Sequence, residues 1–305
     1  MALNINFGVT TWLWTSPFRT ESIKELFPKI AGMGFDVVEI AAEDPSLINP
    51  KVVKEALERY NLKAVICGAF GASRDLTSED TALHHNSFAY IEQCLDLCLE
   101  LGTSFLGGPM YSAVGKARMV PAEQRKIEWE RAVKNLQIVC SMAASRGLQI
   151  ALEPLNRFES DLINTAGDVV RLINDINHPA ARIMLDGFHM NIEERDIEQA
   201  IITAGDKLVH FQVSENYRGT PGTGQSNWGA YRRGLEAVNY MGTVTIESFT
   251  TDNKELAGAV CFWKPMADNQ DKFASEGIRF LKTWAAGKDT ISHHTIFKSL
   301  ANGEE

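Results

Sequence analysis

The chain of 305 residues has no stretch of about 18 consecutive apolar residues, although apolar residues make up 45% of it. A transmembrane helix needs a run of about that length, so we expect no membrane span. The first residues also lack the basic start and the long apolar core of a signal peptide. Together with a charged fraction of 23%, these absences predict a soluble globular protein of the cytoplasm.

Basic side chains are scarce relative to acidic ones. The formal net charge is −9, and no cluster of Lys and Arg is longer than the pair Arg232-Arg233. Proteins that bind nucleic acids gain much of their affinity from basic side chains that neutralise phosphates. The composition therefore argues against a nucleic-acid partner.

The five cysteines do not form the patterns of a disulfide framework or of a zinc site. Their number is odd, and no two of them stand in a C-x-x-C pair. Cys94 and Cys98 are four residues apart on a predicted helix, where apolar packing explains them. We expect reduced thiols in a reducing compartment.

A short β-branched run followed by a longer amphipathic stretch recurs along the whole chain. The predicted strands cover residues 6–11, 36–40, 62–67, 104–108, 149–153, 181–186, 207–212 and 242–247. The predicted helices cover residues 20–34, 50–60, 78–101, 121–146, 165–176, 197–204, 228–239 and 270–286. Eight such units without a linker predict a single-domain α/β fold, the (β/α)8 TIM barrel, over residues 1–286, with a C-terminal tail over 287–305.

An open doubly wound sheet is the alternative to the barrel. Such a sheet should carry a glycine-rich phosphate loop after its first strand. The sequence has Thr10-Thr11-Trp12-Leu13-Trp14 at that place, which favours the barrel.

Four of the later predicted strands each have a polar side chain at the C-terminal end. These side chains are Glu153, Asp186, Gln212 and Glu247. The carboxyl ends of barrel strands face one pocket, so we expect the four to be neighbours. Each acid alone is also explained as a helix cap or an ion-pair partner, but three together repel one another unless a cation lies among them. Oxygen ligands without cysteine point to Mn²⁺, Mg²⁺ or Co²⁺.

The same arrangement suggests proton-transfer chemistry. Glu153 and Glu247 can serve as proton-transfer groups on opposite sides of a bound carbon next to a carbonyl. His189, three residues past Asp186, is a candidate donor or proton shuttle, and Arg218 is a candidate ligand of a substrate oxygen. Alternatively, His189 is a packing residue and Arg218 is a solvated side chain of a loop. Trp12, Trp14 and Trp263 can form apolar walls for a sugar-like ligand or can pack in the core.

Several of these stretches resemble the motifs of the ketose 3-epimerases, the D-tagatose/D-allulose 3-epimerase group of the xylose-isomerase-like TIM barrels. The matching runs are Glu153-Pro154-Leu155-Asn156-Arg157-Phe158-Glu159, Leu185-Asp186-Gly187-Phe188-His189-Met190-Asn191-Ile192-Glu193-Glu194, Glu215-Asn216-Tyr217-Arg218-Gly219, Glu247-Ser248-Phe249 and Phe262-Trp263-Lys264-Pro265-Met266. The resemblance implies that the metal ligands include Glu153, Asp186 and Glu247, with Mn²⁺ favoured. It implies that Glu153 and Glu247 are the catalytic acid/base pair. It further implies substrate contacts from Glu159, His189 and Arg218.

One position departs from that family. The epimerases resembled here have a histidine as the fourth ligand, and this chain has Gln212. An amide oxygen also ligates Mn²⁺ or Mg²⁺, although it is a weaker donor than imidazole. His210, two residues earlier and on the same side of the strand, is the other candidate ligand.

The departure leaves the reaction open between two outcomes. Enzymes of the same superfamily act on 3-keto-glycosides and expel the substituent at carbon 1 by β-elimination, as C-glycoside deglycosidases do with a partner subunit. Ketose epimerisation and this lyase reaction both begin with proton abstraction next to a carbonyl. The resemblance also implies a homo-oligomer or a hetero-partner subunit.

Two hypotheses come from other classes. An endonuclease of the endonuclease IV type would need many histidine ligands and a basic face, whereas this chain has seven histidines and a net charge of −9. A non-catalytic scaffold subunit would have a degenerate site marked by Gln212 and would bind no metal. The acids at positions 153, 186 and 247 argue against the hypothesis of a scaffold subunit.

Overall fold

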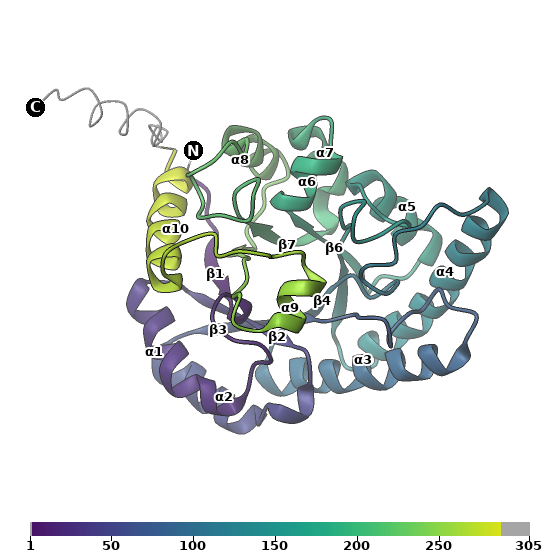
Figure 1. The fold of residues 1–305 in the computed structure, drawn as a ribbon, viewed down its shortest axis with the longest axis horizontal. Helices are drawn as coiled ribbons and strands as arrows, with labels where there is room; N and C mark the ends of the chain where they lie inside the picture. The colour runs from purple at the N-terminus through teal and green to yellow at the C-terminus, as the bar shows by residue number, and fades with distance from the viewer. Residues whose placement is uncertain (1, 288–305) are drawn as a thin grey trace, which may run out of the picture.

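A computed structural model describes residues 2–287, which form a closed barrel of eight parallel strands in the order β1 to β8 (Figure 1). The strands are β1 Asn6–Thr10, β2 Val37–Ala42, β3 Lys63–Gly68, β4 Phe105–Gly108, β5 Gln149–Leu152, β6 Ala181–Asp186, β7 Leu208–Val213 and β8 Thr243–Ile246. Pairing of β1 with β8 closes the barrel and confirms the predicted TIM fold. The predicted tail lies outside the described residues, apart from Gly287.

Helices surround the strands as an outer layer (Figure 1). They are α1 Ile23–Met33, α2 Pro50–Tyr60, α3 Thr81–Leu101, α4 Ala122–Ala144, α5 Ala166–Ile176, α6 Gly187–Glu193, α7 Ile197–Ala204, α8 Trp228–Ala237, α9 Lys254–Ala259 and α10 Gln270–Ala285. Eight of the helices in residues 2–287 coincide with predicted ones, with ends that differ by a few residues.

Two helices, α6 and α9, occupy stretches for which the sequence predicts no helix. The side chain of Asp186 starts α6 by accepting a hydrogen bond from the Phe188 N–H at 2.9 Å. The side chain of Asn253 starts α9 in the same way, through the N–H groups of Glu255 and Leu256. Helices this short show little apolar periodicity, so their caps are the signal that predicts them.

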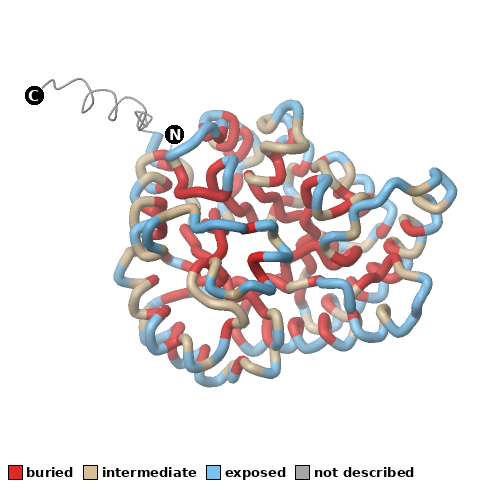
Figure 2. Tube along the Cα trace, in the orientation of Figure 1, coloured by how far each residue is buried: buried red, intermediate tan, exposed pale blue. Residues whose placement is uncertain are grey.

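Alternation along the strands divides the core into two layers. In β2, Val38 and Ile40 pack toward the outer helices, whereas Val37 and Ala41 belong to a cluster inside the barrel. Figure 2 shows the buried trace concentrated on the strands and on the inner faces of the helices. Cys94 and Cys98 are buried in the apolar layer between the strands and the outer helices, which confirms their predicted packing.

The segment after β8 closes over the carboxyl end of the barrel. Leu256 and Ala257 of α9 belong to the same apolar cluster as Phe249, Phe262 and the barrel interior. Figure 1 shows α9 in front of the strands on this side. None of the helices within residues 2–287 has the length and the apolar character needed to cross a bilayer.

Candidate active site

The four strand-end side chains are all buried at the carboxyl end of the barrel. Glu153 and Glu247 directly follow β5 and β8, and each is 4% exposed. Asp186 ends β6 opposite Gln212 of β7, and neither has any exposed surface. The convergence expected from the sequence is therefore present in the fold.

Arg218 lies among these acids. Its Nη1 atom is 2.5 Å from Asp186 Oδ2 and 2.8 Å from Glu247 Oε2. The guanidinium also lies over the ring of Phe188, 4.2 Å from the ring centre, and is almost fully buried. The arginine places a positive charge beside two of the buried carboxylates.

The loop between β7 and α8 holds Arg218 in place. Arg218 has a φ of +63°, in the left-handed region that side chains other than glycine rarely adopt. The Glu215 carboxylate braces the loop by accepting hydrogen bonds from the N–H groups of Gly222 and Ser226 and from the indole of Trp228. The Ser248 hydroxyl donates to the Arg218 carbonyl at 2.8 Å.

His189 of α6 faces Glu153 and Asp186. Its Nε2 atom is 3.6 Å from Glu153 Oε1 and 3.7 Å from Asp186 Oδ2. On the other side of the ring, Nδ1 accepts a hydrogen bond from the Asn156 backbone N–H at 3.1 Å. The Asn156 amide donates to Glu159 at 2.8 Å, so Glu159 is linked to the histidine through this asparagine.

Burial and charge give the three carboxyl groups different affinities for protons. Burial raises the pKa of Glu153 well above its ordinary value, and the neighbouring Glu247 and Asp186 raise it further. Burial likewise raises the pKa of Glu247, against the opposing effect of Arg218. For Asp186, burial is outweighed by Arg218 and His189, which lower its pKa. Asp186 therefore stays ionised while the two glutamates can hold a proton.

These side chains form a donor set suited to a divalent cation. Glu153, Asp186 and His189 each offer a ligand atom within 4.8 Å of the other two. Within residues 2–287, the buried oxygen Oε1 of Gln212 has no hydrogen-bond partner, and Asp186 Oδ2 has none beyond its ion pair with Arg218. A buried amide oxygen without a partner is costly, and a cation would satisfy it. The residues present therefore fit a bound Mn²⁺, Mg²⁺ or Co²⁺.

His210, the alternative ligand considered from the sequence, lies deeper in the barrel and contacts Glu39. Its Nε2 atom is 2.5 Å from Glu39 Oε2. Glu39 stands in the middle of β2 and is absent from the site residues that the sequence predicts. A single acid on the inward-facing side of an otherwise apolar strand is the signal that could have revealed it.

The tryptophans predicted to line the pocket lie in three different environments. Trp14 donates its indole N–H to Asp271 of α10 at 2.7 Å, and Trp263 is 75% exposed. Their role as apolar walls stays a prediction. Trp12 is the buried one, and its ring is 5.7 Å from that of Phe249 at the barrel mouth.

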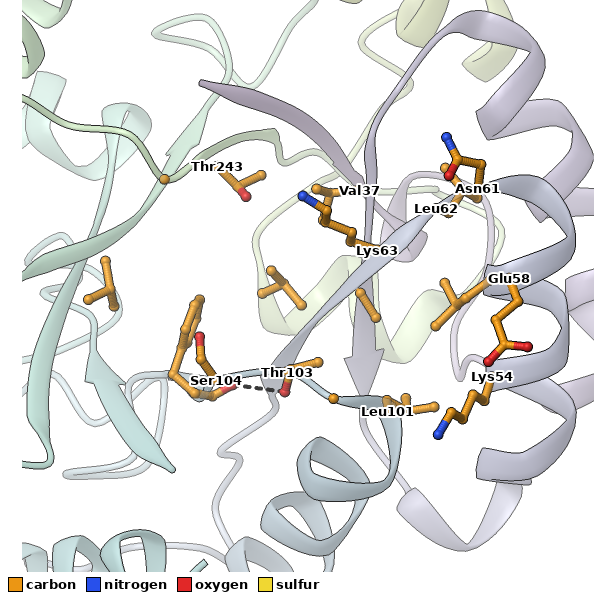
Figure 3. Close-up of a pocket in the computed structure, with 17 residues that line it drawn as sticks. Val37, Lys54, Glu58, Asn61, Leu62, Lys63, Leu101, Thr103, Ser104 and Thr243 are labelled. Atoms are coloured by element: carbon orange, nitrogen blue, oxygen red, sulfur yellow. Dashed lines mark hydrogen bonds between the residues drawn. The ribbon is translucent and has the colours of Figure 1, made fainter. Parts of the chain in front are cut away.

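A cavity of about 560 Å³ lies at the other end of the barrel (Figure 3). It is bordered by the first residues of several strands, among them Val37, Lys63 and Thr243. Lys54 and Glu58 of α2 line it from outside, as the close-up shows. The buried acids are at the opposite end of the strands, so this cavity does not include them.

The sequence that forms this barrel matches the model of a known protein family. Residues 27–284 match the model described as "Xylose isomerase-like TIM barrel". The chain belongs to this family.

Relatives within the xylose isomerase-like family carry the names of sugar epimerases. The chain is 31% identical to D-psicose 3-epimerase of Ruminiclostridium cellulolyticum, an alignment that covers 87% of this chain and 91% of the relative. It is 33% identical to 3-dehydro-D-guloside 4-epimerase of Escherichia coli, covering 75% of this chain and 88% of that protein. The crystal structure of D-allulose 3-epimerase from Methylomonas sp. superposes with a TM-score of 0.86 at 29% identity, covering 93% of this chain and 100% of that one.

Proposed function

We propose that the protein is a divalent-metal-dependent ketose 3-epimerase. The observation that carries the proposal is the pair Glu153 and Glu247, buried together at one end of the barrel with pKa values raised above the ordinary range. The similarity to ketose 3-epimerases over most of the chain supports the substrate class.

The cation would be held by Glu153, Asp186, Gln212 and Glu247, with Mn²⁺ as the favoured ion and Mg²⁺ or Co²⁺ as alternatives. When bound, such an ion polarises the substrate carbonyl and stabilises the enediolate that follows loss of the α-proton. His189 presents its Nε2 atom to Glu153 and Asp186, and that nitrogen carries the ring hydrogen because Nδ1 accepts from the Asn156 backbone N–H, so the histidine is a donor beside the cation site rather than a ligand.

The two glutamates would transfer the proton. They follow β5 and β8, which are separated by β6 and β7 in the barrel, so the carboxyl groups approach a bound carbon from different sides. One ionised glutamate removes the proton from carbon 3, and the electron pair of the broken C–H bond moves toward the carbonyl. The other glutamate, protonated, delivers its proton to the opposite face of the same carbon.

The remaining predicted contacts would orient the sugar. Arg218 and His189 offer N–H donors beside the carboxylates, and Glu159 accepts hydrogen bonds at the same rim. Trp14 and Trp263 stay candidates for the apolar walls. Substrate oxygens would take over the Arg218 guanidinium from Asp186 and Glu247.

Hydrogen exchange in D₂O with Mn²⁺, followed by NMR, tests this function. The samples contain free ketohexoses and, separately, a 3-keto-glycoside. Deuterium at carbon 3 of a ketose together with its 3-epimer is the expected result. Absence of exchange in every sample, with no Mn²⁺ bound, would contradict the proposal and favour a non-catalytic scaffold subunit.

A keto-glycoside substrate is the second candidate, and the similarity to the 3-dehydro-D-guloside 4-epimerase of E. coli favours it. Removal of the hydrogen at carbon 4 by the same glutamates, followed by reprotonation on the other face, would give a 4-epimer. Removal of the hydrogen at carbon 2 would instead allow β-elimination, in which the bond from carbon 1 to its substituent breaks and its electron pair leaves with the substituent. Exchange confined to the keto-glycoside sample, with or without loss of that substituent, distinguishes this candidate.

The other expectations from the sequence stay predictions. They are a small sugar as the ligand, no nucleic-acid or membrane partner, a cytoplasmic location, and a homo-oligomer or a complex with a hetero-partner subunit.

A further inference from the structure

Gln212 uses both of its amide hydrogens on carboxylates. Its Nε2 atom donates to Glu39 Oε1 at 2.8 Å and to Glu247 Oε1 at 3.0 Å. A primary amide has two N–H donors, so its donor capacity is fully used. The two acceptors determine which way the amide points, and they leave its oxygen as the atom without a partner among the described residues.

Glu39 is itself held in position. It is fully buried in the middle of β2, and its second oxygen, Oε2, lies 2.5 Å from His210 Nε2. His210 is packed against the ring of Phe105, with 5.6 Å between ring centres. The carboxylate is therefore fixed at both oxygens, by His210 on one side and by Gln212 on the other.

We propose that Glu39 is a positioning residue that keeps the Gln212 oxygen presented to the cation. Without Glu39, Glu247 is the one acceptor left to the amide, so the amide turns more readily and can offer its NH₂ group, which no cation binds. This inference rests on the proposed metal-dependent function and explains how a glutamine serves at a ligand position for which the resemblance to ketose 3-epimerases implies a histidine. A ring N–H of histidine donated to a carboxylate fixes a metal ligand in the same manner.

Mn²⁺ affinity provides a measurement that does not depend on activity. It is measured by calorimetry and by the electron paramagnetic resonance signal of free Mn²⁺, on purified protein with and without substitutions. Glu39→Met removes the acceptor at similar volume, and Glu39→Asp keeps the charge but withdraws the carboxylate by one methylene. We expect each to weaken Mn²⁺ binding about 10- to 100-fold, the usual loss when a partner of a metal ligand is removed.

Repeating the measurement in a protein that already lacks Gln212 distinguishes a positioning effect of Glu39 from an effect of its charge. In a Gln212→Met protein, the same two changes at residue 39 should alter Mn²⁺ affinity by no more than about three-fold, because the amide through which Glu39 acts is gone. Gln212→His should bind Mn²⁺ more tightly than the wild type and should keep the dependence on Glu39. Circular dichroism and thermal melting identify any variant that is unfolded, and the Glu39→Asp protein carries the test if Glu39→Met fails to fold.

Two results would overturn this inference and leave the proposed function intact. One is wild-type affinity in Glu39→Asp. The other is an equal loss in the wild-type and Gln212→Met backgrounds, which would assign the effect to charge or to general structure. A wild-type protein that binds no Mn²⁺ would instead overturn the proposed function, and the role of Glu39 with it.

Discussion

Arg218 and the carboxylates around it show how individual residues determine the site. The guanidinium touches Asp186 and Glu247, two of the oxygen donors that a divalent cation would use. An arginine cannot lose its proton in a protein, so it competes with the cation for these oxygens at every accessible pH. Binding of the metal and of the sugar should therefore release Arg218 toward the substrate.

Replacing Arg218 by methionine tests this competition. In metal-free protein at pH 8 the change leaves buried acids without a counter-ion, and the free energy of unfolding should fall by about 3 kcal/mol. Mn²⁺ should restore much of that stability, so that the rise in melting temperature on adding Mn²⁺ is larger in the variant than in the wild type.

Arg233→Met is the matched control, because Arg233 of α8 forms an ion pair with Glu198 in which both side chains are well exposed. Exposed pairs contribute about 0–1 kcal/mol, so this variant should melt like the wild type with and without Mn²⁺. Equal Mn²⁺ responses in wild type and Arg218→Met would contradict competition at the site.

Features of single residues that depend on strand position could be predicted from the sequence, whereas those that depend on loop conformation could not. Acids at the ends of apolar runs were predictable, because a barrel brings strand ends together whatever the loops do. The contact of Arg218 with Asp186 was not, since it depends on a left-handed φ within the segment that joins β7 to α8. The pairing of Glu39 with Gln212 joins residues 173 positions apart, which no local pattern encodes.

At the scale of elements, an ion-pair cluster ties together the segments that follow β3, β4 and β5. Lys116 binds Asp75 at 2.7 Å, and Arg118 binds both Glu128 of α4 and Asp161. The backbone N–H of Gly115 donates to the Glu159 carbonyl at 2.7 Å, so the cluster supports the rim that carries this predicted substrate contact.

Acid should weaken the ion-pair cluster. Burial opposes ionisation of Glu128, but Arg118 and Gln124 outweigh it and lower the pKa of this carboxyl below its ordinary value. A lowered pKa stabilises the fold above the unfolded-state value, and the stabilisation is lost as pH falls through the folded-state value. Glu128→Gln should therefore reduce the free energy of unfolding by on the order of 1–3 kcal/mol at pH 7.

Denaturant unfolding of both proteins between pH 7 and about pH 3 measures the difference. It should shrink as the pH falls below the ordinary pKa of glutamate, about 4.3. A difference that stays constant over this range would mean that the charge of Glu128 does not stabilise the cluster.

The elements themselves were largely predictable. Apolar alternation and amphipathic periodicity indicate the strands and the long helices, since both arise from burial against one core. The short helices α6 and α9 were missed because they show little apolar periodicity, and only the capping side chains of Asp186 and Asn253 indicate them. Capping of α6 by Asp186 also means that one acid serves both the helix and the candidate site.

At the scale of the whole molecule, the barrel gathers the buried acids at one end and leaves a cavity at the other (Figure 3). A ligand that binds only the folded barrel should stabilise all of it. At a Mn²⁺ concentration about 100 times Kd, the free energy of unfolding should rise by about 2.7 kcal/mol. Thermal melting with Mn²⁺, and again after adding a chelator, measures this gain.

Asp186→Asn is the companion variant for that melting experiment. It removes the carboxylate whose pKa is lowered, and so removes the acid that is most readily ionised in the site. The Mn²⁺-dependent rise should disappear in this protein. A rise that persists would place the ion somewhere other than among these strand ends.

Proton transfer by Glu153 and Glu247 on opposite faces of one carbon is tested most directly by hydrogen exchange in single variants. Each 3-epimer of a ketohexose is incubated separately in D₂O with Glu153→Gln or Glu247→Gln protein, with Mn²⁺ content measured on the same samples. Glu58→Gln, an exposed change at the far end of the barrel, is the control.

Each variant should exchange the carbon-3 hydrogen of only one epimer, a different one for each variant, and form at least about 100-fold less of the other epimer than the wild type does. Glu58→Gln should behave like the wild type. Exchange of the same epimer by both variants, or undiminished epimer formation in either, would contradict the assignment of the two glutamates.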